Sequence, residues 1–207
     1  FNSVILDLEG NVGVSAYSVV ANIAFVVLSM YSGVAQGVQP LLSDAHGRKD
    51  LKAKDTLLKY SLLTVGVVSS VIYVFIAAFA PEITAIFNSE NNVRLAEIAS
   101  FGMIIYFIGS IFASGNAIFS TYFASIEKPI PSQAITILKG LVIIIPFIYL
   151  FSHFMGMTGV WLAYVLTELI VLTMAVAIYI LFRKRTKKKL LEETNAEDTP
   201  DEVTFEN

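Results

Sequence analysis

Long uncharged apolar stretches alternate with short polar connections along the chain. Each stretch is long enough to cross the hydrocarbon core of a bilayer, which takes about 20 apolar residues in a helix. Lipid offers no partner to backbone N–H and C=O groups, so apolar segments of this length are expected to be α-helical. The pattern predicts five transmembrane helices, over residues 16–38, 60–79, 98–126, 133–152 and 156–182.

The first ten residues, FNSVILDLEG, are typical of the trailing end of a further helix, because an apolar run gives way to Asp7 and Glu9. We therefore expect the sequence to be a fragment that starts inside a preceding helix, with a short N-terminal arm as the alternative. The predicted fold class is all-α: a polytopic membrane helix bundle of about five complete transmembrane helices plus the end of a sixth. Residues 1–182 are expected to form this bundle.

Composition favours a membrane protein over a soluble enzyme. The 207 residues are 56% hydrophobic and 15% charged, whereas soluble domains average about 25% charged residues. The absence of cysteine excludes disulfides, thiol catalysis and cysteine-ligated metals. No HExxH, GxSxG or P-loop motif occurs. We therefore expect no enzymatic activity, no intrinsic ATP hydrolysis, no metal, no cofactor and no nucleic-acid partner.

Basic residues gather on one side of the predicted membrane. The connections after the first, third and fifth stretches hold every lysine and arginine except Arg94 and Lys139. Because positive loops stay on the cytoplasmic side, these connections are predicted to be cytoplasmic in a cell membrane. Residues 183–207 change from basic to acidic, which predicts a disordered cytoplasmic tail. A lipid-binding role for its RKRTKKK run is the alternative. The outward connections are then residues 1–12, 80–97 and 153–155.

Two ionisable residues lie inside the predicted spans, where a charge costs about 2.5–3.5 kcal/mol near the helix centre. Glu168 is close to the middle of the last span, too deep for its short side chain to reach the interface. It either binds a cation or proton during transport or anchors neighbouring helices by hydrogen bonds. Lys139 lies six residues into its span, and we expect its long side chain to reach back to the cytoplasmic interface. An ion pair between the two would require tilted helices.

Uncharged polar and small residues give weaker signals. Asn116, within SGNAIFS, is the best candidate among them to line a cavity. Asn22 and Gln39 are weaker candidates, since such residues mostly form interhelical hydrogen bonds. Small residues and prolines predict close packing and bending. Gly33 and Gly37 form a GxxxG pair, Pro40 is expected to close the first span, and Pro146 is expected to kink the fourth.

Two blocks of sequence together resemble the multidrug and toxic compound extrusion (MATE) family. In the first, residues 13–50, an AYS opening is followed by a helix that ends in GVAQGVQPL, which is similar to the family's G-x-x-x-G-x-Q-P-L pattern. The second block, residues 128–168, resembles the family's last two helices, with Lys139 where arginine is common. The matching residues are Gly13, Ala16, Tyr17, Ser18, Gly33, Gly37, Gln39, Pro40, Leu41 and Gly47 in the first block and Pro146, Gly156, Gly159, Val160, Trp161 and Glu168 in the second.

The resemblance implies a twelve-helix transporter made of two six-helix lobes, of which this chain would be the C-terminal lobe and the missing N-terminal lobe its partner. Such transporters exchange sodium ions or protons for organic cations and other drugs by alternating access. By this resemblance, Glu168 and Asn116 would add polarity to a largely apolar, aromatic-lined cavity. Its candidate wall residues are Tyr17, Tyr31, Tyr106 and Phe112.

The chain departs from the family pattern at the coupling acid. Some members carry it in the tenth helix, and residues 98–126 hold no acid. Others carry it in the first helix, outside this chain, so the resemblance leaves the ligand of the coupling ion open. Two alternatives to drug export remain. One is a flippase for lipid-linked oligosaccharides, whose cavity needs cations such as Lys139. The other is a membrane scaffold that transports nothing.

Overall fold

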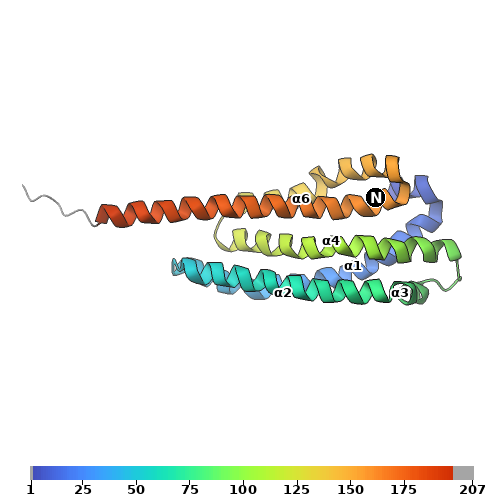
Figure 1. Cartoon of the computed structure of the whole chain (residues 1–207), viewed down its shortest axis with the longest axis horizontal. Coiled ribbons are helices and arrows are strands. Elements are labelled where there is room, and N and C mark those ends of the chain that lie inside the picture. Colours follow the sequence, from blue (N-terminus) through green and yellow to red (C-terminus); the bar gives the residue numbers. More distant parts are fainter. Residues whose placement is uncertain (1, 198–207) are drawn as a thin grey trace, which may run out of the picture.

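The computed structural model describes residues 2–197, and this part of the chain is helical, with no strand. The long helices lie side by side in an elongated bundle (Figure 1). This architecture confirms the predicted all-α membrane helix bundle. Its elements are α1 (Asn2–Gly47), α2 (Leu51–Ala78), α3 (Ala80–Phe87), α4 (Val93–Ser125), α5 (Pro129–Ile137), the π-helical turn η1 (Leu138–Val142) and α6 (Ile144–Glu197).

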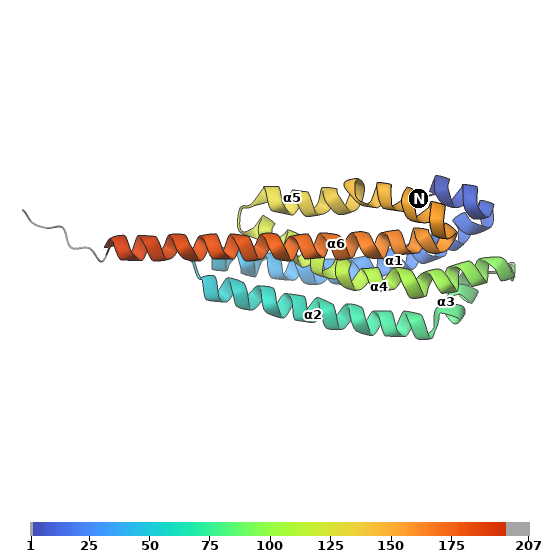
Figure 2. The same ribbon diagram turned by 45° about the horizontal axis from the view of Figure 1, so that its top comes forward.

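Within the described residues, four helical stretches are long and apolar enough to cross a membrane, and the last of them, Pro129–Lys188, contains a reversal. At Gly156 the backbone has φ 56° and ψ −135°, a positive φ that glycine adopts without steric cost. Ile144 and Ile148 before the reversal pack with Ala163 after it. The two halves are therefore antiparallel neighbours (Figure 2), and the chain passes along the bundle five times, as predicted.

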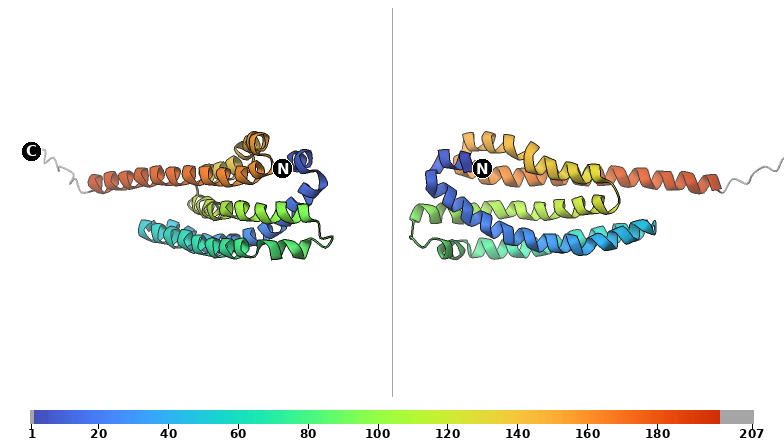
Figure 3. Two further views of the ribbon diagram at one scale, coloured as in Figure 1. Left: turned by 45° about the vertical axis from the view of Figure 1, so that its right-hand side comes forward. Right: turned by 180° about the vertical axis from the view of Figure 1, so that it is seen from behind.

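A second glycine divides α1. Gly10 has φ 61° and ψ −155°, so the helical segment before it turns away from the rest of α1 (Figure 3). This short segment is the part of the sequence that is typical of the end of another helix. Beyond the bend, α1 runs the length of the bundle.

The central element is α4, which contacts α1, α2, α3, α5 and α6. Its glycines allow the second half of α6 to approach closely. A Cβ at Gly102 would lie 2.5 Å from two indole carbons of Trp161, and one at Gly109 would lie 2.7 Å from the Tyr164 ring. Any larger residue here would separate the two helices that carry most of the polar residues inside the bundle.

The structure differs from two expectations for α1. The helix continues through Pro40 to Gly47. A proline removes only one helical hydrogen bond, here the one to the carbonyl of Gln36, and that residue is exposed. In addition, apart from neighbouring residues and backbone of α1 itself, no atom of the described residues lies within 4 Å of a Cβ placed at Gly33 or Gly37. The expected close packing there does not occur within this bundle, because that face of α1 is exposed.

The helix irregularity expected from Pro146 lies one turn earlier, in η1. Pro146 cannot donate to the carbonyl of Val142, the last residue of η1, and its ring would clash with that carbonyl in a regular helix. The helix widens instead, and the backbone N–H of Ile143 donates to the carbonyl of Leu138 at 3.0 Å, which is the spacing of a π turn. The proline thus distorts the element that carries Lys139.

The last helix extends beyond the apolar stretch. α6 continues past Phe182 to Glu197, so residues 183–197, which the charge pattern assigns to a disordered tail, are helical. Arg183 donates to the Asp55 carboxylate of α2 at 2.6 Å, which ties this extension to the bundle. The rest of the predicted tail, residues 198–207, lies outside the described residues.

Candidate functional site

A pocket of about 280 Å³, here called the tyrosine pocket, opens where α1, α4, η1 and the second half of α6 meet. Apolar side chains of α1 form one wall, and tyrosines from three helices form the rest. The two ionisable residues of the spans, Lys139 and Glu168, both line it. Its tyrosines are Tyr17 and Tyr31 from α1, Tyr106 from α4 and Tyr164 from α6.

Glu168 is 5% exposed and is held by α4. The fully buried Asn116 donates its Nδ2 to Glu168 Oε2 at 2.7 Å and to the Glu168 backbone carbonyl at 2.9 Å. These bonds fix the rotamer of the carboxylate and tie α4 to α6. Asn116 Oδ1 has no hydrogen-bond partner among the described residues, which leaves one buried acceptor beside the carboxylate.

Lys139 does not reach back to the interface, contrary to our expectation. Its Nζ lies 3.8 Å from Glu168 Oε1, and its side chain is 26% exposed. The reversal at Gly156 sets the depth of both residues: Lys139 comes 17 residues before it and Glu168 comes 12 residues after it. The five-residue difference is about 7.5 Å of helix, which a lysine side chain can largely span. The pair therefore forms across the last two passes.

Aromatic rings form a continuous layer beside this pair. Tyr106 stacks on Tyr164 with a centroid distance of 4.0 Å and an interplanar angle of 7°. Trp161 meets the Tyr106 ring edge-on at 6.1 Å and lies 5.8 Å from Tyr17 at an angle of 23°. Stacked and edge-to-face rings of this kind position each other firmly. The layer thus presents fixed aromatic faces from α1, α4 and α6.

Sequence reasoning missed Trp161 and Tyr164 as site residues. Both lie on the same face of α6 as Glu168, since positions three, four and seven apart are neighbours on a helix. That spacing from the intramembrane carboxylate is the signal that could have found them. It requires only the assumption that the carboxylate faces the inside of the bundle.

Most of the predicted candidates come together, and three do not. Asn116, Tyr17, Tyr31 and Tyr106 all lie at or behind the pocket with the ion pair. The other three are elsewhere. Asn22 lines a separate apolar pocket of about 640 Å³ between α1, α2 and α3. Gln39 is exposed near the end of α1, and Phe112 is half-buried on α4 without lining the tyrosine pocket.

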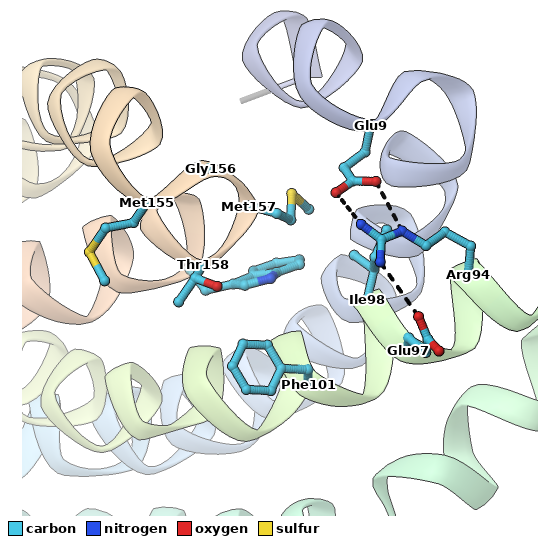
Figure 4. Close-up of a pocket in the computed structure, with 10 residues that line it drawn as sticks. Glu9, Arg94, Glu97, Ile98, Phe101, Met155, Gly156, Met157 and Thr158 are labelled. Atoms are coloured by element: carbon cyan, nitrogen blue, oxygen red, sulfur yellow. Dashed lines mark hydrogen bonds and ion pairs between the residues drawn. The ribbon is translucent and has the colours of Figure 1, made fainter.

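A further pocket, of about 440 Å³ and here called the Arg94 pocket, lies at the end of the bundle where the chain reverses at Gly156. Figure 4 shows the Arg94 guanidinium between the carboxylates of Glu9 and Glu97. Arg94 donates to both Glu9 oxygens, at 2.6 and 3.1 Å, and to Glu97 at 3.5 Å. The hydrogen bond to Glu9 raises the pKa of Arg94. Trp161 lines this pocket and touches the rings of the other, so its indole separates the two.

Long apolar helices around an ion pair in their spans define a polytopic helical membrane protein, a class in which intramembrane charges mark functional sites. Residues 1–150 match the family model described as MatE. The chain belongs to the MatE family. No curated protein matches it.

Solved structures share the fold. An outward-facing multidrug resistance MATE family transporter of the MOP superfamily is 20% identical, with a TM-score of 0.85 over 90% of this chain and 42% of its own. An inward-facing multidrug resistance MATE family transporter of the MOP superfamily is 21% identical, with a TM-score of 0.85 over 90% of this chain and 43% of its own. A MOP superfamily transporter from Pyrococcus furiosus is described as having a binding pocket of reverse polarity. It is 21% identical, with a TM-score of 0.81 over 89% of this chain and 41% of its own. The chain thus spans about two fifths of the length of these transporters.

Proposed function

We propose that this chain is the C-terminal lobe of a secondary active antiporter that exports organic cations or drugs in exchange for sodium ions or protons. Membership of the MatE family supports this proposal. So does the similarity to multidrug transporters in both outward-facing and inward-facing conformations, with the same TM-score of 0.85. Alternating access by rocking requires two nearly rigid lobes that keep their own fold in both states. A lobe of this kind should resemble outward-facing and inward-facing structures equally well.

The observation that carries the proposal is the buried Glu168 carboxylate beside fixed aromatic faces. Lys139 is the one cation close to it in the described part of the chain; it is 3.8 Å away and partly exposed, so another cation can replace it. An organic cation in the tyrosine pocket would gain attraction from the ring faces and from the carboxylate. A proton or sodium ion on Glu168 would remove that attraction. One carboxylate that holds one cation at a time couples export of the drug to uptake of the ion.

The size of the pocket fits a shared site. At about 280 Å³ it falls just below the 300–1,000 Å³ of most small-molecule sites. A second lobe facing α1 and α6 would enlarge and enclose it. The missing N-terminal lobe is therefore the partner that we propose to complete the cavity, and the coupling ion could bind in either lobe.

Orientation in a cell membrane follows the charge pattern. We place the end of the bundle that carries the lysine-rich connections, and the C-terminal tail, on the cytoplasmic side. The Arg94 pocket and the reversal at Gly156 would then face outward. Drug leaving the tyrosine pocket would pass the indole of Trp161 to reach that side.

A flippase for lipid-linked oligosaccharides is less well supported. Its cavity needs net positive charge for a pyrophosphate, and in the tyrosine pocket Lys139 is matched by Glu168. The Pyrococcus furiosus transporter described as having reverse pocket polarity keeps a flippase or other anion carrier as the second candidate. A scaffold that transports nothing is the third.

Export of ethidium, a fluorescent organic cation, from cells that express the complete protein tests these candidates. We expect Glu168→Gln to slow export about tenfold or more, because a desolvated cation contact of about 2 kcal/mol exceeds the 1.4 kcal/mol per factor of ten. The matched control is Glu82→Gln, an exposed carboxylate on α3, which should leave export unchanged. Equal export by Glu168→Gln at equal expression would remove this residue from the mechanism, and no export by the wild type would favour the scaffold.

A further inference from the structure

A fourth pocket, of about 350 Å³, lies at the lysine-rich end of the bundle. It is formed where the end of α1, the start of α2 and the extension of α6 beyond the apolar stretch meet. The tyrosine pocket and the Arg94 pocket share none of its residues. The charged groups and the histidine that line it are His46, Lys52, Lys54, Asp55, Arg183 and Lys187.

The pocket has an excess of positive charge. Four of its side chains are cations and one is a carboxylate. That carboxylate, Asp55, already accepts one hydrogen bond on each oxygen, from Tyr179 Oη at 2.7 Å and from Arg183 Nη2 at 2.6 Å. Lys52 and Lys187 are exposed and form no ion pair with any residue that the structure describes. These two lysines therefore have no counter-ion among the described residues.

The buried cation of the pocket has an unusual partner. Lys54 is 7% exposed, and its Nζ lies 3.2 Å from Nδ1 of His46, a neutral acceptor. Burial lowers the pKa of Lys54, because an ammonium taken out of water is costly, and the charges of Asp55 and Asp50 raise it again only in part. An anionic ligand in the pocket would offset that cost.

The position of the pocket identifies the source of the anion. Phe182, which ends the last apolar stretch, and Tyr122 line it together with the cations. It therefore lies where the hydrocarbon region gives way to water, with an apolar wall on one side and lysines on the other. A soluble anion would leave that wall unmatched, whereas a phospholipid brings a phosphate and acyl chains at this depth. Basic pockets between transmembrane helices are the usual sites for anionic headgroups.

We propose that this pocket binds the phosphate headgroup of an anionic phospholipid, with Lys52, Lys54 and Lys187 as its ligands. The headgroup would bridge α2 and α6 beside the Asp55–Arg183 ion pair and hold the two helices together at the membrane surface. This inference requires only that the chain spans a membrane, so it does not depend on the transport cycle. Failure of drug export would leave it untouched.

Lipid titration of the complete purified protein, followed by native mass spectrometry, tests the proposal. The probes are palmitoyl-oleoyl phosphatidylglycerol, the matching phosphatidylcholine, and inorganic phosphate as the soluble competitor. We expect the phosphatidylglycerol to bind to the protein. At equal concentration, neither the phosphatidylcholine nor inorganic phosphate should displace it.

The variant Lys52→Gln/Lys187→Gln should bind phosphatidylglycerol about fivefold more weakly for each cation removed, since a lysine near the surface contributes about 1 kcal/mol. The matched control, Lys59→Gln/Lys184→Gln, removes two exposed lysines from the same two helices outside the pocket and should bind almost as the wild type does. All four lysines are exposed, so both variants should fold. Equal losses in the two variants, or displacement by inorganic phosphate, would overturn the proposal.

Discussion

Alanine at Gly102 of α4 would place a methyl group against Trp161 of α6. The added Cβ would lie 2.5 Å from two indole carbons, well inside van der Waals contact. Trp161 is 1% exposed, and Tyr17 and Tyr106 lie against its ring. The indole therefore cannot move away without displacing the aromatic layer of the tyrosine pocket.

The size of the effect follows from two opposing contributions. Overpacking of a well-packed core costs about 1–3 kcal/mol. Replacing glycine by alanine inside a helix gains about 1 kcal/mol. We expect Gly102→Ala to lower the free energy of unfolding by about 1 kcal/mol, and by up to about 2 kcal/mol if the indole cannot adjust.

Gly66 of α2 supplies the control, because a Cβ placed there meets no atom within 4 Å in the described residues, apart from neighbouring residues and backbone of α2 itself. Gly66→Ala should keep the helical gain without the clash and raise the free energy of unfolding by up to about 1 kcal/mol. The measurement is denaturant unfolding of the complete protein in mixed micelles, followed by circular dichroism. If Gly102→Ala proved as stable as Gly66→Ala, the close approach of α4 to α6 would be refuted.

Three further predictions concern polar contacts. Lys139→Met and Glu168→Gln should each destabilise the protein, and the double variant should lose less than their sum by about 1 kcal/mol or more; strictly additive losses in unfolding would contradict the ion pair. Asn116→Ala removes both hydrogen bonds to Glu168 and should lower the free energy of unfolding by about 2 kcal/mol. An unchanged free energy of unfolding would contradict the importance of these bonds. Burial and the charge of Lys54 lower the pKa of His46, so stability should fall as pH drops below the unfolded value of about 6.5. His46→Gln should flatten that part of the pH profile, and an unchanged slope would exclude His46 as its source.

The helices could be predicted because lipid imposes a simple rule on the sequence. Charge-free stretches of about 20 residues mark the spans, and the fourth and fifth were separated at residues 153–155, next to the observed reversal at Gly156. Glu168 and Lys139 stood out because a charge in hydrocarbon is costly. The spans are marked by many residues acting together, whereas each of these two residues carries a large energetic signal alone.

Contacts between helices were harder to predict. Counting from the expected start of its span places Lys139 near the interface and makes a pair with Glu168 require tilted helices, whereas the reversal at Gly156 brings the two residues to similar depths. Gly33 and Gly37 match a packing motif, yet the helix face that they lie on is exposed here. A small-residue motif indicates that another helix can approach closely, but it does not identify that helix. Gly102 does pack closely, and only the structure shows that Trp161 faces it.

Transport by the complete protein in sealed vesicles tests the central claim most directly. Ethidium would be followed while an inward sodium gradient, an inward proton gradient or neither is imposed. The account predicts ethidium movement that requires one of the two gradients, stops when that gradient is dissipated, and is reduced about tenfold or more by Glu168→Gln. Ethidium movement that ignores both gradients, or that Glu168→Gln leaves intact, would contradict it.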